Sequence, residues 1–388
     1  MKELREITVV GGGIGGLATA LGISQLGKEV TVLEKAPQFG EVGAGIQLAP
    51  NATKILNDLG VLEEVLEYAV QPKRLVLRDV YTAKELASLD LNEQFRKRYQ
   101  YPYVVVHRSD LHHILLDACK NQQNKIELRN NVDVTNIIPG KPITIETEAG
   151  QSFQTQHLVG ADGLWSNTRK IFTEDEPVCS KYVAYRGTLP TEEISDHVNL
   201  DDVIMWIGPN LHLVQYPVRS GKLFNQVVVF KSYNYDPNSD NWGTPEEMDR
   251  RFKNSHPLVQ TALSFIERQF RWPMYDREPL NKWVKDNIAL IGDAAHPMLQ
   301  YLAQGGCQAL EDVATIKSEL SNGADIEEAF SNYESKRLKR GNKVQSNARL
   351  WGEFLHLEDK LSLKLRDMIF EQHHPQDYQV TDFLYKTY

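Results

Sequence analysis

A histidine and a tyrosine in the middle of the chain are the side chains best suited to move protons. His212 and Tyr216 lie in the segment His212-Leu213-Val214-Gln215-Tyr216, which is typical of a β-strand. Alternation would place His212, Val214 and Tyr216 on one face, where the two polar groups can grip a small ligand. Both can transfer protons. The simpler interpretation, which periodicity alone favours, is a half-buried strand whose polar tips find local partners.

A glycine-rich turn near the N-terminus predicts a dinucleotide site. It follows the apolar run Ile7 to Val10 and matches the pattern G-x-G-x-x-G. Gly11 makes the tight turn, Gly13 lets a pyrophosphate approach the backbone, and Gly16 lets the following helix pack on the strand. The N-terminus of that helix offers free N–H groups and a partial positive charge to the phosphate.

An acidic residue closes the next strand about twenty residues further on. Glu34, followed by Lys35, comes directly after Val30 to Leu33. A carboxylate at this place can accept hydrogen bonds from a ribose 2′-hydroxyl. The same charge would repel a 2′-phosphate, so the site disfavours NADP. The motif alone leaves NAD and FAD open.

Two later turns also place an aspartate at the end of a strand, beside glycine or alanine. Asp162 follows Leu158 to Gly160, and Asp293 follows Ile288 to Gly292. Each carboxylate can accept hydrogen bonds from ligand hydroxyls, while the small neighbours leave room for the ligand. We expect each turn to be a strand–turn–helix unit. A simple dehydrogenase needs only the first motif.

The pattern of elements predicts an α/β (α+β) fold with an inserted sheet. A strand–helix–strand unit opens the chain, and short strand-like segments without helices fill about Lys181 to Ser232. We predict a Rossmann-like nucleotide-binding domain over residues 1–175, which resumes over 276–320, an antiparallel-sheet substrate domain over 176–275, and C-terminal helices over 321–388. The basic cluster Lys336 to Arg340 is interpreted as a solvated helix face.

Composition narrows the class of protein. The formal net charge is −9 and the isoelectric point is near 5.7, which argues against a nucleic-acid partner. No apolar run reaches the roughly eighteen residues that a transmembrane helix needs, and the N-terminus does not match a signal peptide. The three cysteines, Cys119, Cys179 and Cys307, lack metal-site spacing. We expect a cytoplasmic protein without a metal site; a homodimer is compatible with the sequence, which does not determine the oligomeric state.

The three turns, in this order, resemble those of the flavoprotein aromatic hydroxylases of the p-hydroxybenzoate and salicylate hydroxylase type. The resemblance extends from Ile7 to the helix after Gly305. It implies a non-covalently bound FAD, NADH or NADPH as a transient co-substrate, and O2. The absence of a second G-x-G-x-x-G fits a nicotinamide that visits briefly.

The resemblance also assigns cofactor contacts. Asp293 is expected to bind the ribityl chain, and Arg108 the FAD backbone, although a surface ion pair with Asp110 is the alternative for Arg108. Gly305 and Gly306 begin a helix whose N-terminus would face the flavin pyrimidine edge. The loop expected to run past the flavin contains Gly45, Ile46 and Gln47.

The strand of His212 and Tyr216 resembles that of the family branch that converts 3-hydroxybenzoate to gentisate. That branch has a glutamine after the third motif, as here at Gln300, where most relatives have proline. A loop amide satisfied by backbone is the alternative for Gln300. The resemblance implies oxygen transfer from a flavin C4a-hydroperoxide to the ring, with His212 as the base and Tyr216 and Gln300 orienting the substrate.

Three other functions stay open at this stage. One is salicylate 1-hydroxylation with loss of CO2. Another is flavin-dependent hydroxylation of an antibiotic, a quinone precursor or a purine. The third belongs to a different class, a flavin-binding sensor without turnover, which would have no need of a proton-transfer pair beside the flavin.

Overall fold

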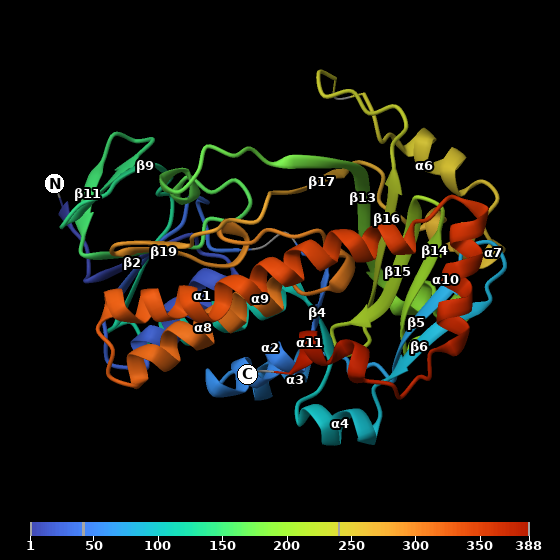
Figure 1. The fold of residues 1–388 in the computed structure, drawn as a ribbon, viewed down its shortest axis with the longest axis horizontal. Helices are drawn as coiled ribbons and strands as arrows, with labels where there is room; N and C mark the ends of the chain where they lie inside the picture. Colours follow the sequence, from blue (N-terminus) through green and yellow to red (C-terminus); the bar gives the residue numbers. More distant parts are fainter. Residues whose placement is uncertain (1, 41–42, 240, 387–388) are drawn as a thin grey trace.

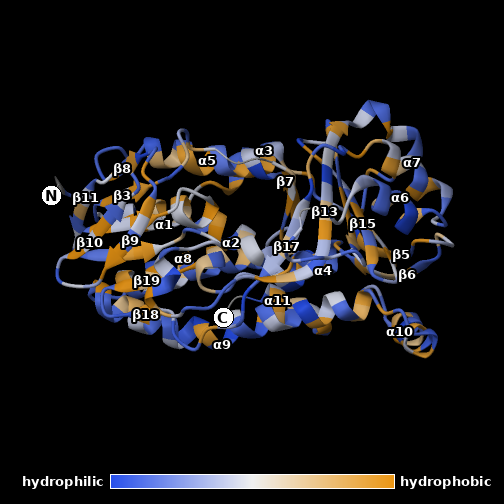
Figure 2. Cartoon of the chain, turned by 90° about the horizontal axis from the view of Figure 1, so that it is seen from above, coloured by the Kyte–Doolittle hydropathy of each residue, from blue (hydrophilic) through white to orange (hydrophobic). Residues whose placement is uncertain are grey.

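The protein has two lobes, each built on its own large sheet, and a long helix runs along both (Figure 1). The computed structural model describes residues 2–40, 43–239 and 241–386. Within these residues, no helix is both long enough and apolar enough to span a membrane. Seen from above, α9 lies along one side of the molecule and α10 stands at its end (Figure 2).

The first lobe is organised by a mostly parallel sheet. Among the described residues six strands form it, in the order β18-β19-β12-β2-β3-β8, and only the edge strand β18 is antiparallel to its neighbour. Strands β2 and β3 are buried throughout, as expected for a sheet covered on both faces. The strands are β2 (Ile7–Val10), β3 (Val30–Leu33), β8 (Ile126–Arg129), β12 (His157–Gly160), β18 (Val284–Lys285) and β19 (Ile288–Leu290).

Helices cover this sheet, and a smaller sheet extends it. Helix α1 packs against both α5 and α8. The smaller sheet has the order β1-β11-β10-β9 within the described residues, and β10 and β11 form an antiparallel hairpin. The helices are α1 (Ile14–Ser24), α2 (Pro50–Asp58), α3 (Leu62–Tyr68), α4 (Glu93–Tyr99), α5 (Arg108–Lys120) and α8 (Gly305–Ser321), and the strands are β1 (Lys2–Glu3), β9 (Val134–Ile138), β10 (Ile143–Thr147) and β11 (Ser152–Thr155).

The second lobe is organised by a seven-stranded sheet in the order β17-β13-β16-β15-β14-β5-β6 within the described chain. Its central strands are antiparallel, as predicted, but β14 pairs with β5 in parallel. The strands are β5 (Arg74–Asp79), β6 (Glu85–Asp90), β13 (Val178–Pro190), β14 (Val203–Gly208), β15 (Leu211–Val218), β16 (Leu223–Lys231) and β17 (Trp272–Asp276). Because β5 and β6 come from inside residues 1–175, the predicted domain boundary does not follow this sheet.

Helices α6 (Pro245–Phe252) and α7 (Pro257–Ser264) belong to this lobe, and three more follow α8. Between α8 and α9, Gly323 adopts a φ of 94°, a conformation that favours glycine. The C-terminal helices are α9 (Ile326–Leu355), α10 (Lys360–Gln372) and α11 (Asp382–Tyr385).

Three local predictions differ from the structure. The turns at Asp162 and Asp293 lead into short 3₁₀ segments, Thr168–Ile171 and Gly292–Ala294, and not into α-helices. The segment expected as a loop past the flavin is β4 (Gly45–Leu48), which pairs with β7 (Val104–His107). Pairing with a strand sixty residues away fixes its conformation, and local sequence carries no sign of that partner.

The basic cluster in α9 is partly buried, in contrast to its predicted role as a solvated face. Arg337 is 4% exposed, and its Nε donates to Asp312 of α8 at 2.9 Å. It also pairs with Glu311, which Arg340 contacts at 2.6 Å. Helical spacing turns Arg337 and Arg340 toward α8, while Lys339 stays exposed. The ion pairs therefore bind α9 to α8.

We predict that Arg337→Met will lower the free energy of unfolding by about 3–5 kcal/mol, because it leaves two buried carboxylates without this partner. Urea denaturation of the FAD-loaded protein measures the change. Lys339→Met is the matched control, and its effect should stay within about 0.5 kcal/mol. Equal effects of the two variants would contradict the assignment of Arg337 to a buried network.

Candidate active site

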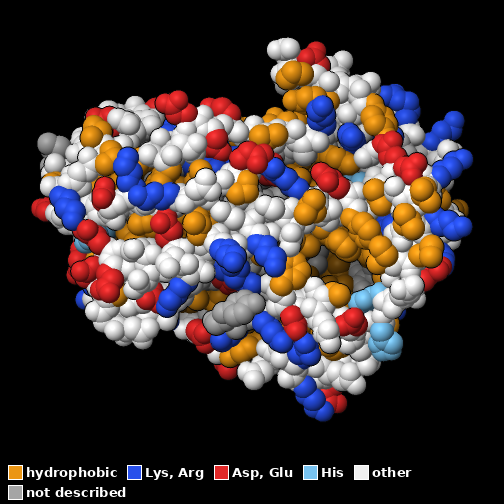
Figure 3. All heavy atoms as spheres, in the orientation of Figure 1, with side chains coloured by type: hydrophobic (Ala, Val, Ile, Leu, Met, Phe, Trp, Pro, Cys, Tyr) orange, Lys and Arg blue, Asp and Glu red, His pale blue; other side chains and the backbone are white. Residues whose placement is uncertain are grey.

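A single large cavity brings the predicted site residues together. Its volume is about 1090 Å³, and a hollow rimmed by hydrophobic side chains is visible on the surface between the C-terminal helices and the seven-stranded sheet (Figure 3). Gly16 alone of the predicted residues does not line it. The others do: Gly11, Gly13, Glu34, Lys35, Gly45, Ile46, Gln47, Arg108, Asp162, His212, Tyr216, Asp293, Gln300, Gly305 and Gly306.

The N-terminal glycine turn is packed too tightly for side chains. Gly11 has a φ of 107°, and a Cβ at Gly16 would collide with the carbonyl oxygen of Gly11. Gly13 is the N-cap of α1 and has no side chain in front of the helix end. The backbone at the start of α1 therefore lines the cavity without a side chain in front of it, as the close approach of a pyrophosphate requires.

Glu34 holds this turn and also lines the cavity. Its Oε2 accepts a hydrogen bond from the N–H of Gly12 at 2.7 Å, and its Oε1 accepts one from Ala36 at 2.8 Å. A carboxylate has further lone pairs for a ribose hydroxyl. Lys35 lies beside it on the cavity wall.

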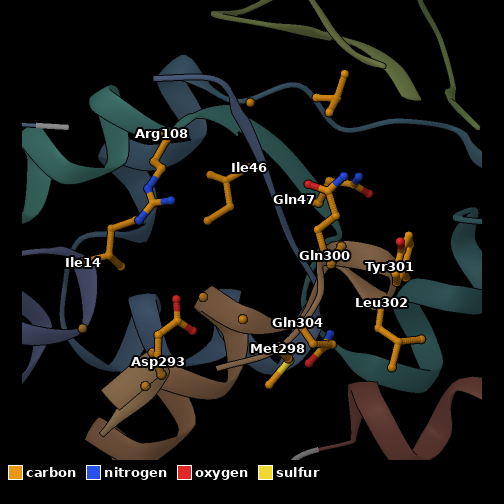
Figure 4. Close-up of a pocket in the computed structure, with 18 of the residues that line it drawn as sticks. Ile14, Ile46, Gln47, Arg108, Asp293, Met298, Gln300, Tyr301, Leu302 and Gln304 are labelled. Carbon is orange, nitrogen blue, oxygen red and sulfur yellow. The ribbon is translucent and has the colours of Figure 1, made fainter. Parts of the chain in front are cut away.

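Asp293 and Arg108 face the same space from different elements (Figure 4). Asp293 is open to the cavity but lies deep within the protein, where burial raises its pKa and Arg108 opposes that effect. Asp110, the alternative partner of Arg108, forms its ion pair with Arg219 at 2.9 Å. A carboxylate and a guanidinium thus flank a space that can receive a polar, partly anionic ligand.

Asp162 is engaged by its own turn. Its Oδ1 accepts a hydrogen bond from the Ser166 hydroxyl at 2.6 Å, and its Oδ2 accepts two from Thr168 at 2.9 Å. These bonds shape the second motif. Arg169, in the same motif, is fully buried. Its guanidinium donates hydrogen bonds to the backbone carbonyls of Ala294 and Ala295 and so links the second motif to the third.

The N-terminus of α8 closes the cavity beside β4. Gly305 and Gly306 form its first turn, and a Cβ at Gly306 would lie 3.0 Å from the side chain of Ile46. Gln47 is fixed by Tyr103, whose hydroxyl donates to its Oε1 at 2.7 Å. The partial positive charge of the helix end favours an anionic group at this side.

His212 and Tyr216 share a face of β15 and both line the cavity, as alternation predicts. Tyr216 is 3% exposed and packs on Gly45, where any Cβ would collide with its ring. His212 is 1% exposed, and its Nδ1 lies 2.8 Å from Nε2 of His356. Burial, and secondly His356, lower the pKa of His212 well below its ordinary value, so the ring is neutral at pH 7.

Arg186, which the sequence analysis missed, belongs to the same face. In the sheet register Val214 of β15 lies opposite Val227 of β16, and Val227 lies opposite Arg186 of β13. The Nη2 of Arg186 donates to Oε1 of Gln300 at 3.4 Å, so this amide has a side-chain partner that also faces the cavity. The alternation of Ala184, Arg186 and Thr188 was the available signal, but only the register reveals its partners.

Known proteins resemble this chain along almost its whole length. The family model described as an FAD binding domain matches residues 5–348. The chain is 36% identical to 3-hydroxybenzoate 6-hydroxylase 1 of Aquipseudomonas alcaligenes over 98% of this chain and 97% of that protein. It is 37% identical to 3-hydroxybenzoate 6-hydroxylase of Klebsiella oxytoca, over 92% and 90%. The chain belongs to the FAD-dependent aromatic hydroxylases.

The fold of these hydroxylases is also seen in a solved structure. Klebsiella pneumoniae HpxO, complexed with FAD and uric acid, superposes with a TM-score of 0.86 at 22% identity and covers 99% of this chain and 96% of its own. The protein is thus an FAD-dependent aromatic-ring monooxygenase with a Rossmann-like FAD-binding fold, which confirms the predicted family, fold class and cofactor.

The cavity fits FAD on the evidence of its own residues. The bare backbone of the first motif can approach a pyrophosphate, Glu34 can accept from the ribose, and Asp293 is an acceptor open to the cavity. Bound FAD supplies the hydride acceptor and the oxygen activation of this enzyme class. We propose that the protein holds it through these groups, with Arg108 and the α8 N-terminus on either side.

We predict that Asp293→Ala will weaken FAD binding about tenfold to 150-fold, because a charge-assisted hydrogen bond is worth about 1.5–3 kcal/mol. Fluorescence titration of the apoprotein with FAD gives the dissociation constant. Gln300→Ala, on the substrate side, is the control and should leave that constant unchanged. An unaltered FAD affinity in Asp293→Ala would remove Asp293 from the list of ribityl ligands.

Proposed function

We propose that the protein hydroxylates 3-hydroxybenzoate at the position para to its hydroxyl and so forms 2,5-dihydroxybenzoate, gentisate. FAD, NADH or NADPH and O2 are the other reactants. The observation that carries the proposal is the cavity face that a neutral histidine, a tyrosine and a partly buried arginine line together: His212, Tyr216 and Arg186. The names of the two curated relatives agree with it.

Arg186 provides the recognition of an acid. Burial lowers its pKa, but a guanidinium stays protonated in proteins. Among the described residues no carboxylate forms an ion pair with it, and its Nε has no hydrogen-bond partner. A partly buried cation in this state is stabilised by an anionic ligand. A benzoate carboxylate is planar and matches the guanidinium fork.

His212 and Tyr216 provide the recognition of a phenol. Because Nδ1 of His212 is bound to His356, Nε2 is the nitrogen left for the substrate. A neutral imidazole can accept the phenol proton, and a phenolate ring is far more nucleophilic than a phenol. Burial raises the pKa of Tyr216, which keeps its hydroxyl a donor at neutral pH.

The position of hydroxylation follows from these two anchors. With the hydroxyl held by His212 and Tyr216 and the carboxylate held by Arg186 and Gln300, the ring edge opposite the hydroxyl is left to face the flavin. In 3-hydroxybenzoate that edge carries C6. Apolar wall residues, Leu75, Met205 and Val227 among them, keep water from this side of the ring.

The experiment that tests the proposal is NADH and NADPH oxidation with a panel of hydroxybenzoates, followed by product identification. We expect 3-hydroxybenzoate to stimulate oxidation most strongly and to yield 2,5-dihydroxybenzoate. Faster formation of catechol from salicylate would replace the proposal by salicylate 1-hydroxylation. Bound FAD without stimulation by any aromatic compound, including purines and quinone precursors, would favour a sensor without turnover.

A second prediction concerns Arg186. Arg186→Met should raise the dissociation constant of 3-hydroxybenzoate about tenfold to 150-fold, since it removes a charge-assisted contact. The perturbation of the oxidised flavin spectrum reports binding without turnover. The neutral analogue 3-hydroxybenzamide should bind equally to both proteins, and Arg186→Lys should lose less affinity. Equal weakening for acid and amide, or loss of FAD, would assign Arg186 to packing or to the cofactor.

A further inference from the structure

A second histidine stands directly behind His212, outside the cavity. His356 follows the last residue of α9 and does not line the cavity, whereas His212 does. The two nitrogens, Nδ1 of His212 and Nε2 of His356, are 2.8 Å apart, and the planes of the two rings differ in orientation by 14°. His356 is 3% exposed. The contact is therefore a buried hydrogen bond between imidazoles of two distant elements.

Both rings are neutral, so the hydrogen bond contains one proton. Burial, followed by Arg366 and Lys231, lowers the pKa of His356 to about 3. A neutral imidazole has one donor and one acceptor nitrogen. If Nδ1 of His212 carries the shared proton, Nε2 of His212 is an acceptor toward the cavity. If Nε2 of His356 carries it, Nε2 of His212 is a donor.

Nothing else in the described surroundings fixes the proton on one side. Nδ1 of His356 is buried and has no hydrogen-bond partner, so either tautomer of His356 leaves one unsatisfied atom there. Such an orphan costs about 1–3 kcal/mol and calls for an explanation when it is kept in a native protein. No hydrogen bond at Nδ1 of His356 therefore selects one tautomer of the pair, and a proton at the cavity side can shift the balance.

The residues around His212 and His356 hold the two imidazoles in place and disfavour their protonation before an anion forms in the cavity. Tyr182 stacks on His356 at a centroid distance of 5.1 Å, and Tyr301 meets both imidazoles edge-on. Burial raises the pKa of both tyrosines, so they stay uncharged. The charged groups that act on His356 are the cations Arg366 and Lys231. An imidazolium is thus disfavoured until an anion forms in the cavity.

We propose that His356 is a positioning residue that sets the tautomer of His212 and shares its proton during hydroxylation. This inference rests on the proposed function, in which His212 is the base for the phenol. The phenol O–H bond breaks and its proton binds Nε2 of His212, while the proton on Nδ1 moves toward Nε2 of His356. The pair gains one positive charge opposite the phenolate. When the ring regains its aromaticity, the hydrogen on C6 leaves as a proton and neutralises the oxygen left on the oxygen donor. The proton held by the histidine pair returns to the oxygen on C3, and the pair is neutral again.

Three substitutions at position 356 separate this role from packing. His356→Gln keeps an acceptor for the Nδ1 proton of His212. His356→Phe keeps a flat ring against Tyr182 but has no acceptor, and His356→Met repeats the loss of the acceptor in case the phenylalanine variant does not hold FAD. Tyr182→Phe, which keeps the stacked ring, is the matched control, and His212→Phe is the reference for complete loss.

Two readouts are used, and only one of them needs turnover. Nitrogen-15 NMR of histidine-labelled protein assigns the tautomer of His212, and the ratio of 2,5-dihydroxybenzoate formed to NADH consumed measures coupling. We expect His356→Phe and His356→Met to alter the tautomer and to lower the rate of coupled product formation about a hundredfold or more, the scale of general-base assistance. His356→Gln should recover most of that rate, and Tyr182→Phe should match the wild type.

The outcomes distinguish this inference from the proposed function. Wild-type coupling and an unchanged His212 tautomer in both His356→Phe and His356→Met would overturn the role of His356, as would a glutamine variant no better than they are. Unimpaired coupling in His212→Phe would overturn the base assignment itself. If the wild type forms no gentisate, the proposed function fails. The NMR readout still tests the role of His356, because an unaltered His212 tautomer in the phenylalanine and methionine variants would contradict that role.

Discussion

One buried carboxylate, Asp312, determines how the two halves of the site meet. Its Oδ2 accepts hydrogen bonds from the N–H of Gly292 at 2.9 Å and from His296 at 2.6 Å, and its Oδ1 accepts one from Arg337. Burial alone would raise the pKa of Asp312, but His296 and Arg337 keep it below its ordinary value. A desolvated charge is stable only with such partners. The turn of Asp293, the start of α8 and the body of α9 are consequently held in one arrangement.

The consequence reaches the substrate side through α9. The same helix that Arg337 binds to α8 ends next to His356, which touches His212 on β15. The turn of Asp293 and strand β15 are thus connected through a helix. Two kinds of charged group lie between the turn of Asp293 and β15. Those in the ion network are fully paired, whereas the polar groups that face the cavity, Arg186 and Asp293, keep capacity for ligands.

Short sequence patterns were sufficient to predict much of the fold and of the cavity lining. The glycine turn, Glu34 and the alternation of His212 and Tyr216 depend on residues close in sequence, and the structure has them where the patterns indicate. Strand β5, by contrast, pairs with β14, which lies more than a hundred residues later, and β6 joins the sheet through β5. No local pattern reveals that pairing. Arg186 and His356 were missed for the same reason, since sheet register and helix length bring them to His212. The cluster at Arg337 was misjudged because its charges resemble those of a solvated face until the acidic residues of α8 are in place.

The shared sheet has an implication for how this enzyme class diversifies. Its substrate lobe is not a contiguous cassette, because strands from residues 74–90 complete the sheet formed by residues 178–276, and α10 packs on β6. Exchange of one continuous segment between two crossover points would therefore combine β5 and β14 from different proteins and disrupt their pairing. Chimeras that exchange the second lobe between relatives must therefore transfer both segments together.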